Sequence, residues 1–218
     1  MIYSVGALVP LSMQTPEEDD PYQRPTVWGV GLNGTFVKMN NHNFPIGKEL
    51  PSEVMNLGVS AIHLRPLKTR WSMLMALGAG SYTPENRLSS IHIGENVVAN
   101  GAVVFIWHWK PNLEIGGGAA LNNTFGYPMV FPALYVKYKG GFADKFTIEA
   151  ASIDGAKIAF GYNFSERFNL KLVANVGGYA AYLKRNGRKE TFTQQNIITG
   201  LQPEFKIGKY LSIPIIVG

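Results

Sequence analysis

The sequence predicts an all-β protein, namely an antiparallel up-and-down transmembrane β-barrel with about twelve strands in the native protein. Three observations lead to this fold class. Apolar residues alternate with small or polar ones at a period of two along most of the chain, whereas helical periodicity is nearly absent. Only 16% of the 218 residues are charged, compared with about 25% in a typical soluble domain. Tight turns separate the alternating segments, as neighbouring antiparallel strands require.

The N-terminal region has two interpretations. Residues 1–14, MIYSVGALVPLSMQ, have an apolar centre followed by small residues, which is typical of the end of a secretory signal peptide. We favour a truncated signal-peptide remnant, and the alternative is a first strand over residues 2–9. Residues 15–25 are acidic and contain proline, so we expect an irregular segment there. The barrel domain then spans residues 26–218.

The strands of this domain are predicted from their two different faces. Residues 26–38 alternate large apolar side chains with glycine, asparagine and threonine, and residues 70–80 alternate tryptophan, methionine and leucine mainly with small residues. Residues 112–122 and 156–164 repeat the pattern. In chain order, the predicted strands are residues 26–38, 55–65, 70–80, 97–109, 112–122, 128–139, 144–152, 156–164, 168–183, 191–206 and 210–218.

The turns indicate which residues share a face. A three-residue turn at 153–155, with glycine last, fits a type I turn followed by a left-handed bulge. The turn at 165–167 has the same length, and both turns keep the apolar residues of neighbouring strands on one face. With these turns, Glu149 and Lys171 come close across a strand of small residues. We therefore predict an ion pair between them.

The apolar face is predicted to point outward. The other face carries glycine, alanine, asparagine, serine and threonine with few charges, which would be a poor surface for a soluble protein. A charge-free apolar band flanked by aromatic residues is typical of a lipid-facing barrel surface. Closure into a barrel would also remove the exposed edges of so large a sheet. The aromatic residues expected to form such a girdle are Trp71, Trp107, Trp109, Tyr162, Phe164, Phe168 and Tyr210.

Three stretches carry a resemblance to a known class: WGVGLNGTFVK, FPALYVKYKGGFADKFTIEAAS and NLKLVANVGGYAAY. Over residues 26–218 the chain resembles the outer-membrane β-barrel proteins of Bacteroidota, in particular families of unknown function. The resemblance implies a Gram-negative source and an outer-membrane location, and it implies no reaction. Bacterial single-chain barrels have even strand numbers. We therefore expect a twelfth strand, either missing after Gly218, which we favour, or supplied by residues 2–9.

The interior of such a barrel would hold the polar residues of the inward face. An ion pair there would either stabilise the barrel or form a charged constriction that selects solutes. The four histidines form no metal-binding motif, and we expect neither a metal nor a cofactor. The candidate lumen-facing residues are Glu114, Glu149, Lys157, Lys171, Asn163 and Asn175.

One loop contains residue types used in hydrolysis. Ser89, Ser90, His92 and Glu95 lie close in the sequence, but a nucleophile and its base must meet at hydrogen-bond distance, which this spacing does not indicate. We therefore interpret these residues as part of an ordinary loop, and we do not expect the protein to be an enzyme.

The expected function is a small-solute pore or a structural subunit of an outer-membrane complex. Its expected partners are outer-membrane lipid, lipopolysaccharide and other outer-membrane proteins. The net charge is +5, but the densest basic run, residues 184–189, reads as a hairpin loop, so no nucleic acid is expected. The alternatives are an outer-membrane enzyme that modifies lipid A or phospholipid, and a soluble lipocalin-like binding barrel.

Overall fold

The computed structural model describes residues 1–15, 22, 24–39, 50–68, 70–122, 128–141, 144–152, 155–185, 187–207 and 211–214. Within these residues the chain forms twelve strands and one short 3₁₀ helix, η1 (Leu88–Ser90). The strands are β1 (Ile2–Gln14), β2 (Thr26–Lys38), β3 (Glu53–Lys68), β4 (Trp71–Thr83), β5 (Val97–Lys110), β6 (Leu113–Asn122), β7 (Met129–Gly140), β8 (Phe146–Ala151), β9 (Ala156–Asn163), β10 (Phe168–Arg185), β11 (Arg188–Ile207) and β12 (Leu211–Pro214).

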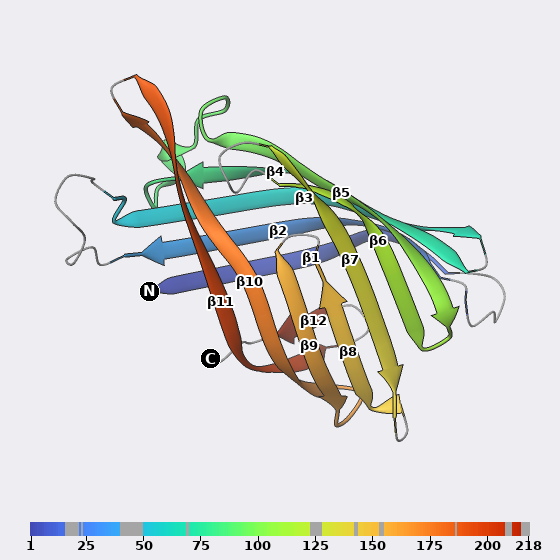
Figure 1. Cartoon of the computed structure of the whole chain (residues 1–218). Coiled ribbons are helices and arrows are strands. Elements are labelled where there is room, and N and C mark those ends of the chain that lie inside the picture. The colour runs from blue at the N-terminus through green and yellow to red at the C-terminus, as the bar shows by residue number, and fades with distance from the viewer. Residues whose placement is uncertain are drawn as a thin grey trace.

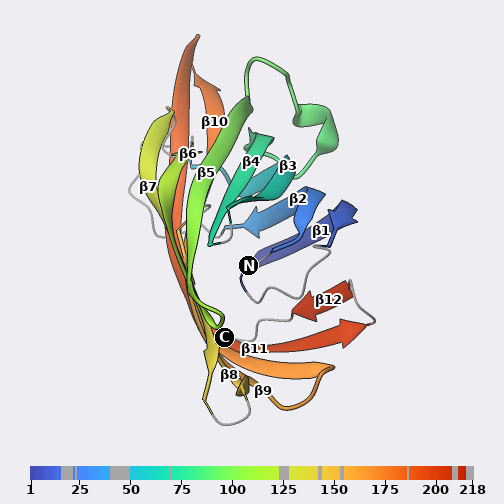
Figure 2. The ribbon, with the colours of Figure 1, turned by 90° about the vertical axis from the view of Figure 1, so that its right-hand side faces the viewer.

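The strands form one antiparallel sheet in which each strand pairs with the next along the chain (Figure 1). The predicted all-β antiparallel meander is therefore confirmed. The sheet curls into a half-barrel with β1 and β12 at its two ends (Figure 2), and no hydrogen-bonded pairing joins these two strands within the described residues. In the part of the chain that the structure describes, no helix has the length and hydrophobicity needed to span a membrane.

The N-terminal segment belongs to the sheet. Strand β1 pairs with β2 from Ile2, opposite Val37, to Gln14, opposite Thr26. The first-strand alternative for this segment thus agrees with the structure, and the strand is longer than the expected residues 2–9. The described part of the sheet has twelve strands because β1 is the strand beyond the eleven predicted from residues 26–218. The favoured prediction had instead placed the twelfth strand after Gly218.

The two tight turns set the register as predicted. The backbone N–H of Phe164 donates to the carbonyl of Phe168 at 3.1 Å, which closes the turn between β9 and β10. Gly155, at the end of the turn between β8 and β9, has a φ of 83°, the left-handed conformation that favours glycine. As a result Glu149 lies opposite Ala159, and Lys171 lies opposite Gly161.

The connections differ between the two ends of the strands. At the end that we call the short-turn end, connections such as residues 111–112 and 164–167 are short. At the other end, which we call the long-loop end, β2 and β3 are joined by residues 39–52, and β4 and β5 by residues 84–96. The two long connections of this end are accompanied by the short ones at 152–155 and 186–187, and at the short-turn end the connection at 15–25 is the long exception.

The long hairpin of β10 and β11 crosses in front of β2, β3 and β4 in Figure 1. Buried Tyr179 and Ala181 of β10 pack there against Val37 and Val54 from β2 and β3. With its amide suitably oriented, Asn56 of β3 donates to the carbonyl of Ala180 at 2.7 Å and accepts from its N–H at 3.1 Å. This contact joins the two sides of the curl near the long-loop end.

Candidate interior site and aromatic band

The predicted ion pair between Glu149 and Lys171 is present and includes a third residue. The Nζ of Lys171 lies 3.2 Å from Oε1 of Glu149 and 3.1 Å from Oε2 of Glu204. Small residues of β9 at Ala159 and Gly161 leave the space in which these side chains meet. The Lys171 side chain is buried, so its charge is compensated mainly by these two carboxylates.

A second polar cluster joins β4, β5 and β6 to the segment before β2. An Nη of Arg24 lies 2.8 Å from Oε1 of Glu114, and Nδ1 of His108 lies 3.5 Å from the same oxygen. Nε2 of His108 shares a 2.8 Å hydrogen bond with Oγ of Ser72, and the Tyr135 hydroxyl donates to Oε2 of Glu114 at 3.2 Å. Glu114 is thus the centre of this cluster.

Cross-strand neighbours connect the two clusters. Lys137 of β7 is the register partner of Glu114 on one side and of Glu149 on the other. Among the described residues, the joined set contains three cations and three carboxylates and so is balanced in charge. We call it the ion-pair network. Its ion-paired members are Arg24, Lys171, Glu114, Glu149 and Glu204, and the exposed Lys137 is included as the register neighbour of Glu114 and Glu149.

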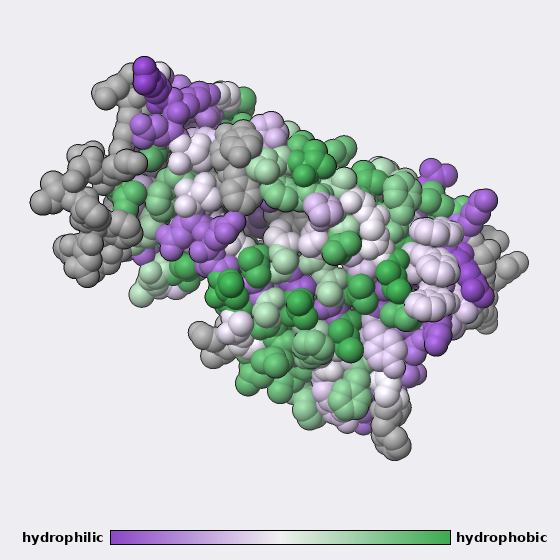
Figure 3. Space-filling model, viewed as in Figure 1, coloured by the Kyte–Doolittle hydropathy of each residue, from purple (hydrophilic) through white to green (hydrophobic). Residues whose placement is uncertain are grey.

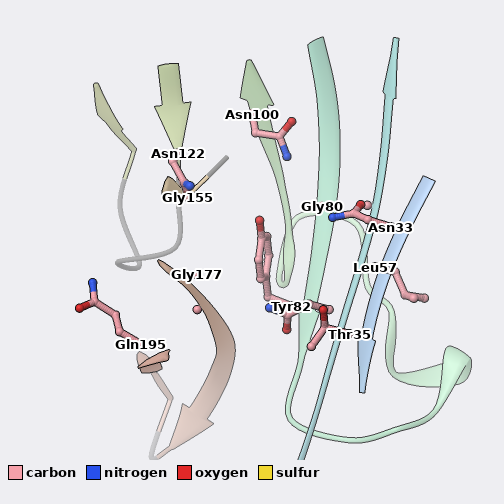
Figure 4. A pocket seen from close by; sticks show the side chains of 13 residues that line it. Asn33, Thr35, Leu57, Gly80, Tyr82, Asn100, Asn122, Gly155, Gly177 and Gln195 are labelled. Carbon is pink, nitrogen blue, oxygen red and sulfur yellow. The ribbon is translucent and has the colours of Figure 1, made fainter. Parts of the chain in front are cut away.

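A cavity of about 240 Å³ lies toward the long-loop end of the interior. Figure 4 shows Asn33, Tyr82, Asn100 and Asn122, from four different strands, around the same space. Asparagine, threonine, glutamine, tyrosine and glycine dominate its wall, and none of its described lining residues carries a charge. The lining of the cavity is therefore neutral, whereas the charged clusters lie nearer the short-turn end; Lys157 lies between them, two residues from the cavity-lining Gly155.

The outer face is apolar across the middle of the strands. Figure 3 shows hydrophobic residues gathered there on the side that faces the viewer, with hydrophilic residues toward the two ends of the molecule. On β5, side chains at 103, 105 and 107 are exposed, whereas those at 104, 106 and 108 are buried. Other exposed outward side chains are Leu77, Leu134, Ile148, Ile158, Phe160, Leu172, Ile197 and Leu201.

Aromatic rings follow this outer face near the short-turn end, and we call them the aromatic band. Trp71, Trp107 and Trp109 form a stack with ring centroids 6.1 and 5.7 Å apart. Trp28 stacks on His63 at 3.9 Å. On the other side of the curl the rings also contact one another in a row, each centroid within 5.7 Å of the next: Phe146, Tyr162, Phe164, Phe168 and Phe205.

The family model for a domain of unknown function, DUF6268, matches residues 1–218. The chain belongs to the DUF6268 family. The expectation of an uncharacterised family is thereby confirmed. No curated protein and no solved structure matches the chain.

Three of the six lumen-facing candidates belong to the ion-pair network of this DUF6268 chain, namely Glu114, Glu149 and Lys171. The other three lie on the same inward face outside the network. Lys157 and Asn175 are register partners, and Asn163 lies opposite Asn169 of β10. Within the described residues, Lys157 forms no ion pair.

Several members of the network were not expected from the sequence. Glu204 alternates with the apolar outward residues of β11, but the connection at 184–190 left the register between β10 and β11 open. Ser72, His108 and Arg24 are far apart in the sequence, and only the register across β4, β5 and β6 brings the first two together. The signal available in the sequence was the position of His108 on the inward face of the predicted strand 97–109.

Ser72, His108 and Glu114 resemble a catalytic triad in their order of contacts, but not in their accessibility. Ser72 is 1% exposed and His108 is 2% exposed, so a substrate does not reach the hydroxyl. In the loop singled out from the sequence, Oγ of Ser90 donates to Glu85 at 3.0 Å, and Nδ1 of His92 lies 2.9 Å from the Ser90 carbonyl. Neither histidine is therefore paired with an accessible serine hydroxyl.

Six of the seven residues predicted for a girdle lie among the contacting rings near the short-turn end. Trp71, Trp107, Trp109, Tyr162, Phe164 and Phe168 are members of the aromatic band. Tyr210 lies outside the described residues. Within those residues, histidine and acidic side chains form no cluster of three or more that could hold a metal ion.

Proposed function

We propose that the protein is an integral β-barrel of a bacterial outer membrane whose polar interior admits small solutes. The observation that carries the proposal is the combination of an apolar outer face and a polar, charge-bearing interior. A soluble barrel has the opposite arrangement, because its exterior must be hydrated. The sequence resemblance to outer-membrane barrels of Bacteroidota supports a Gram-negative source.

The dimensions of the apolar face fit a bilayer. On β10 the outward positions from Phe168 to Gly178 carry no charge. Ten residue steps at about 3.4 Å each span about 34 Å along the strand. At the strand tilt of about 40° usual for membrane barrels, this corresponds to a height of about 26 Å, close to the expected band of about 25 Å.

The aromatic band supports the same proposal. Tryptophan and tyrosine prefer the boundary between lipid tails and headgroups, since their rings are apolar and their N–H or O–H groups are polar. All four tryptophans of the chain, Trp28, Trp71, Trp107 and Trp109, are exposed on the outer face near the short-turn end. The lipid and lipopolysaccharide of the outer membrane would be the partners of this surface.

The position of these tryptophans gives a direct test. The purified chain is inserted into vesicles containing phosphatidylcholine brominated either near the headgroup or near the end of the acyl chain, and tryptophan emission is measured. We expect strong quenching by the shallow bromines, weaker quenching by the deep ones, and little quenching by aqueous acrylamide. Efficient acrylamide quenching with no effect of either lipid would contradict the proposal.

Within this proposal, the ion-pair network is the constriction of the lumen. Lys171 meets Glu149 across β9 and Glu204 on the adjacent strand β11, and these fixed charges would select solutes by charge and size. The test is the ion selectivity of conductance in planar bilayers for the wild type and for the variants Glu149→Ala and Lys171→Ala. We expect selectivity to shift in opposite directions in the two variants. Unchanged selectivity accompanied by lower heat stability would leave the network a purely stabilising role.

A structural subunit is the second candidate, and the burial of the network favours it. Buried Ser72, His108, Asn169, Lys171 and Gln202 fill part of the interior near the short-turn end. A barrel filled in this way would be a rigid partner in an outer-membrane complex. Liposome swelling separates the two candidates, because a pore admits sugars into the vesicles and a filled barrel does not.

A further inference from the structure

The interior cavity offers the hydrogen-bonding groups of a neutral ligand site. Its lining includes the inward side chains of Asn33, Tyr82, Asn100 and Asn122, from four strands, whereas the amide of Asn56, which also lines it, is bonded to the backbone of Ala180. Each carboxamide has two N–H donors and a carbonyl acceptor, and the phenol both donates and accepts. The wall therefore presents donors and acceptors in mixed order around one space.

The chemistry of this wall discriminates between solute classes. A sugar or polyol hydroxyl also donates and accepts, so a mixed amide wall can replace its water hydrogen bonds. An ion entering the same space would lose hydration, and none of the described lining residues would supply the opposite charge. The neighbouring inward cation is Lys157, two residues from Gly155, so an anion such as phosphate is the more demanding comparison. The ring of Tyr82 adds a flat apolar surface of the kind that fits the carbon-bearing face of a sugar.

The size of the cavity limits the ligand. Its volume is about 240 Å³. It is below the roughly 300 Å³ at which pockets for drug-sized ligands begin. A single monosaccharide or a polyol of similar size therefore fits the space better than a longer oligosaccharide.

Glycines opposite the amides hold parts of the wall in place. A Cβ on Gly58 would overlap the side-chain oxygen of Asn33, and a Cβ on Gly78 would lie 2.7 Å from Oδ1 of Asn100. The two amides thus rest directly on the neighbouring backbone, where a larger residue would displace them. Such contact restricts their rotamers before a ligand arrives, which lowers the entropy lost on binding.

We propose that this cavity binds one small, neutral, hydroxyl-rich solute, of the class of monosaccharides and polyols. The inference rests on the proposed function, because the solute reaches the cavity through a water-accessible interior. It goes further by naming the solute class and by placing recognition in the cavity with the uncharged lining. The ion-pair network lies outside this binding site.

Gly177 provides a specific way to test the site. It lines the cavity, and a Cβ built on it meets only Oδ1 of Asn196, at 3.8 Å, so a leucine there fills the cavity without meeting the backbone. Gly117 of β6 is the matched control, because a Cβ there has nothing within 4 Å and the residue lies on the outer face. Both substitutions replace a strand glycine by leucine.

The experiment is equilibrium dialysis of the full chain in detergent micelles against radiolabelled glucose, with labelled inorganic phosphate as the ionic comparison. We expect glucose binding without phosphate binding, a loss of affinity of at least about tenfold in Gly177→Leu, and no change in Gly117→Leu. If Gly177→Leu does not fold, Asn100→Leu fills the same cavity from the opposite wall and is expected to give the same loss. No glucose binding by the folded wild type, equal binding of phosphate, or unchanged binding in the folded cavity variants would overturn the proposal.

The lipid-quenching experiment, on the same purified chain inserted into vesicles, separates the two failures. Quenching by brominated lipid without glucose binding overturns the solute site and leaves the membrane proposal standing. Absence of lipid quenching overturns the proposed function whatever the dialysis shows.

Discussion

Replacing Lys171 by methionine tests the interior ion-pair network most directly. Methionine keeps much of the length of the side chain and removes the ammonium group. The Nζ of Lys171 lies 3.1 Å from Glu204 and 3.2 Å from Glu149, so the variant leaves two carboxylates facing each other without their cation. Lower stability is expected mainly from these uncompensated charges rather than from lost packing.

The size of the effect follows from the burial of the three groups. Breaking a buried ion pair by removing one partner costs about 3–5 kcal/mol. The side chains of Lys171 and Glu204 are 10% and 14% exposed, whereas that of Glu149 is 31% exposed and is partly screened by water. We therefore expect the lower limit, about 3 kcal/mol, which is more than a hundredfold in the unfolding equilibrium constant.

The assay is reversible urea unfolding of the chain in detergent micelles, followed by tryptophan fluorescence. The matched control is the triple variant Lys171→Met, Glu149→Gln, Glu204→Gln, in which no charge is left uncompensated. We expect the triple variant to regain most of the lost free energy of unfolding. The reasoning is refuted if Lys171→Met loses less than about 1 kcal/mol, or if the triple variant is as unstable as the single one.

Two further substitutions test the other contacts. A Cβ at Gly118 would overlap the backbone carbonyl oxygen of Val103, which cannot move aside. We therefore expect Gly118→Ala to lower the free energy of unfolding by about 3 kcal/mol or to prevent folding. Gly117→Ala, one residue away, places its Cβ in open space and is expected to leave stability unchanged. Equal melting curves for the two alanine variants would disprove this steric argument. Arg24→Met removes the cation 2.8 Å from Glu114 and is expected to lower the free energy of unfolding by about 2 kcal/mol, with partial recovery when Glu114→Gln is added. Urea unfolding measures the single and the double variant. If the effects of the two substitutions simply add, the two groups are not coupled.

The pairing of Glu149 with Lys171 was predictable because it depends on local rules. Side chains alternate between the two faces of a strand, and two three-residue turns fix the register of β8, β9 and β10. The outward aromatic residues were predictable for the same reason. Their spacing in the sequence indicates their face, and their closeness to turns indicates their height along the strand.

The rest of the interior depended on contacts that no local rule describes. Glu204 reaches Lys171 only through the register of the long hairpin of β10 and β11. Arg24 precedes β2, yet it meets Glu114 of β6 because the sheet curls.

By itself, the sequence determined an antiparallel meander with one apolar and one polar face, since a period of two is a property of each strand alone. The tertiary structure decided that Ile2–Gln14 joins the sheet, how the charges combine, and that a neutral cavity remains beyond them. The physical reason is that curling and the crossing of β10 over β3 and β4 bring together residues far apart in the chain. Such long-range contacts leave no periodic signal in the sequence.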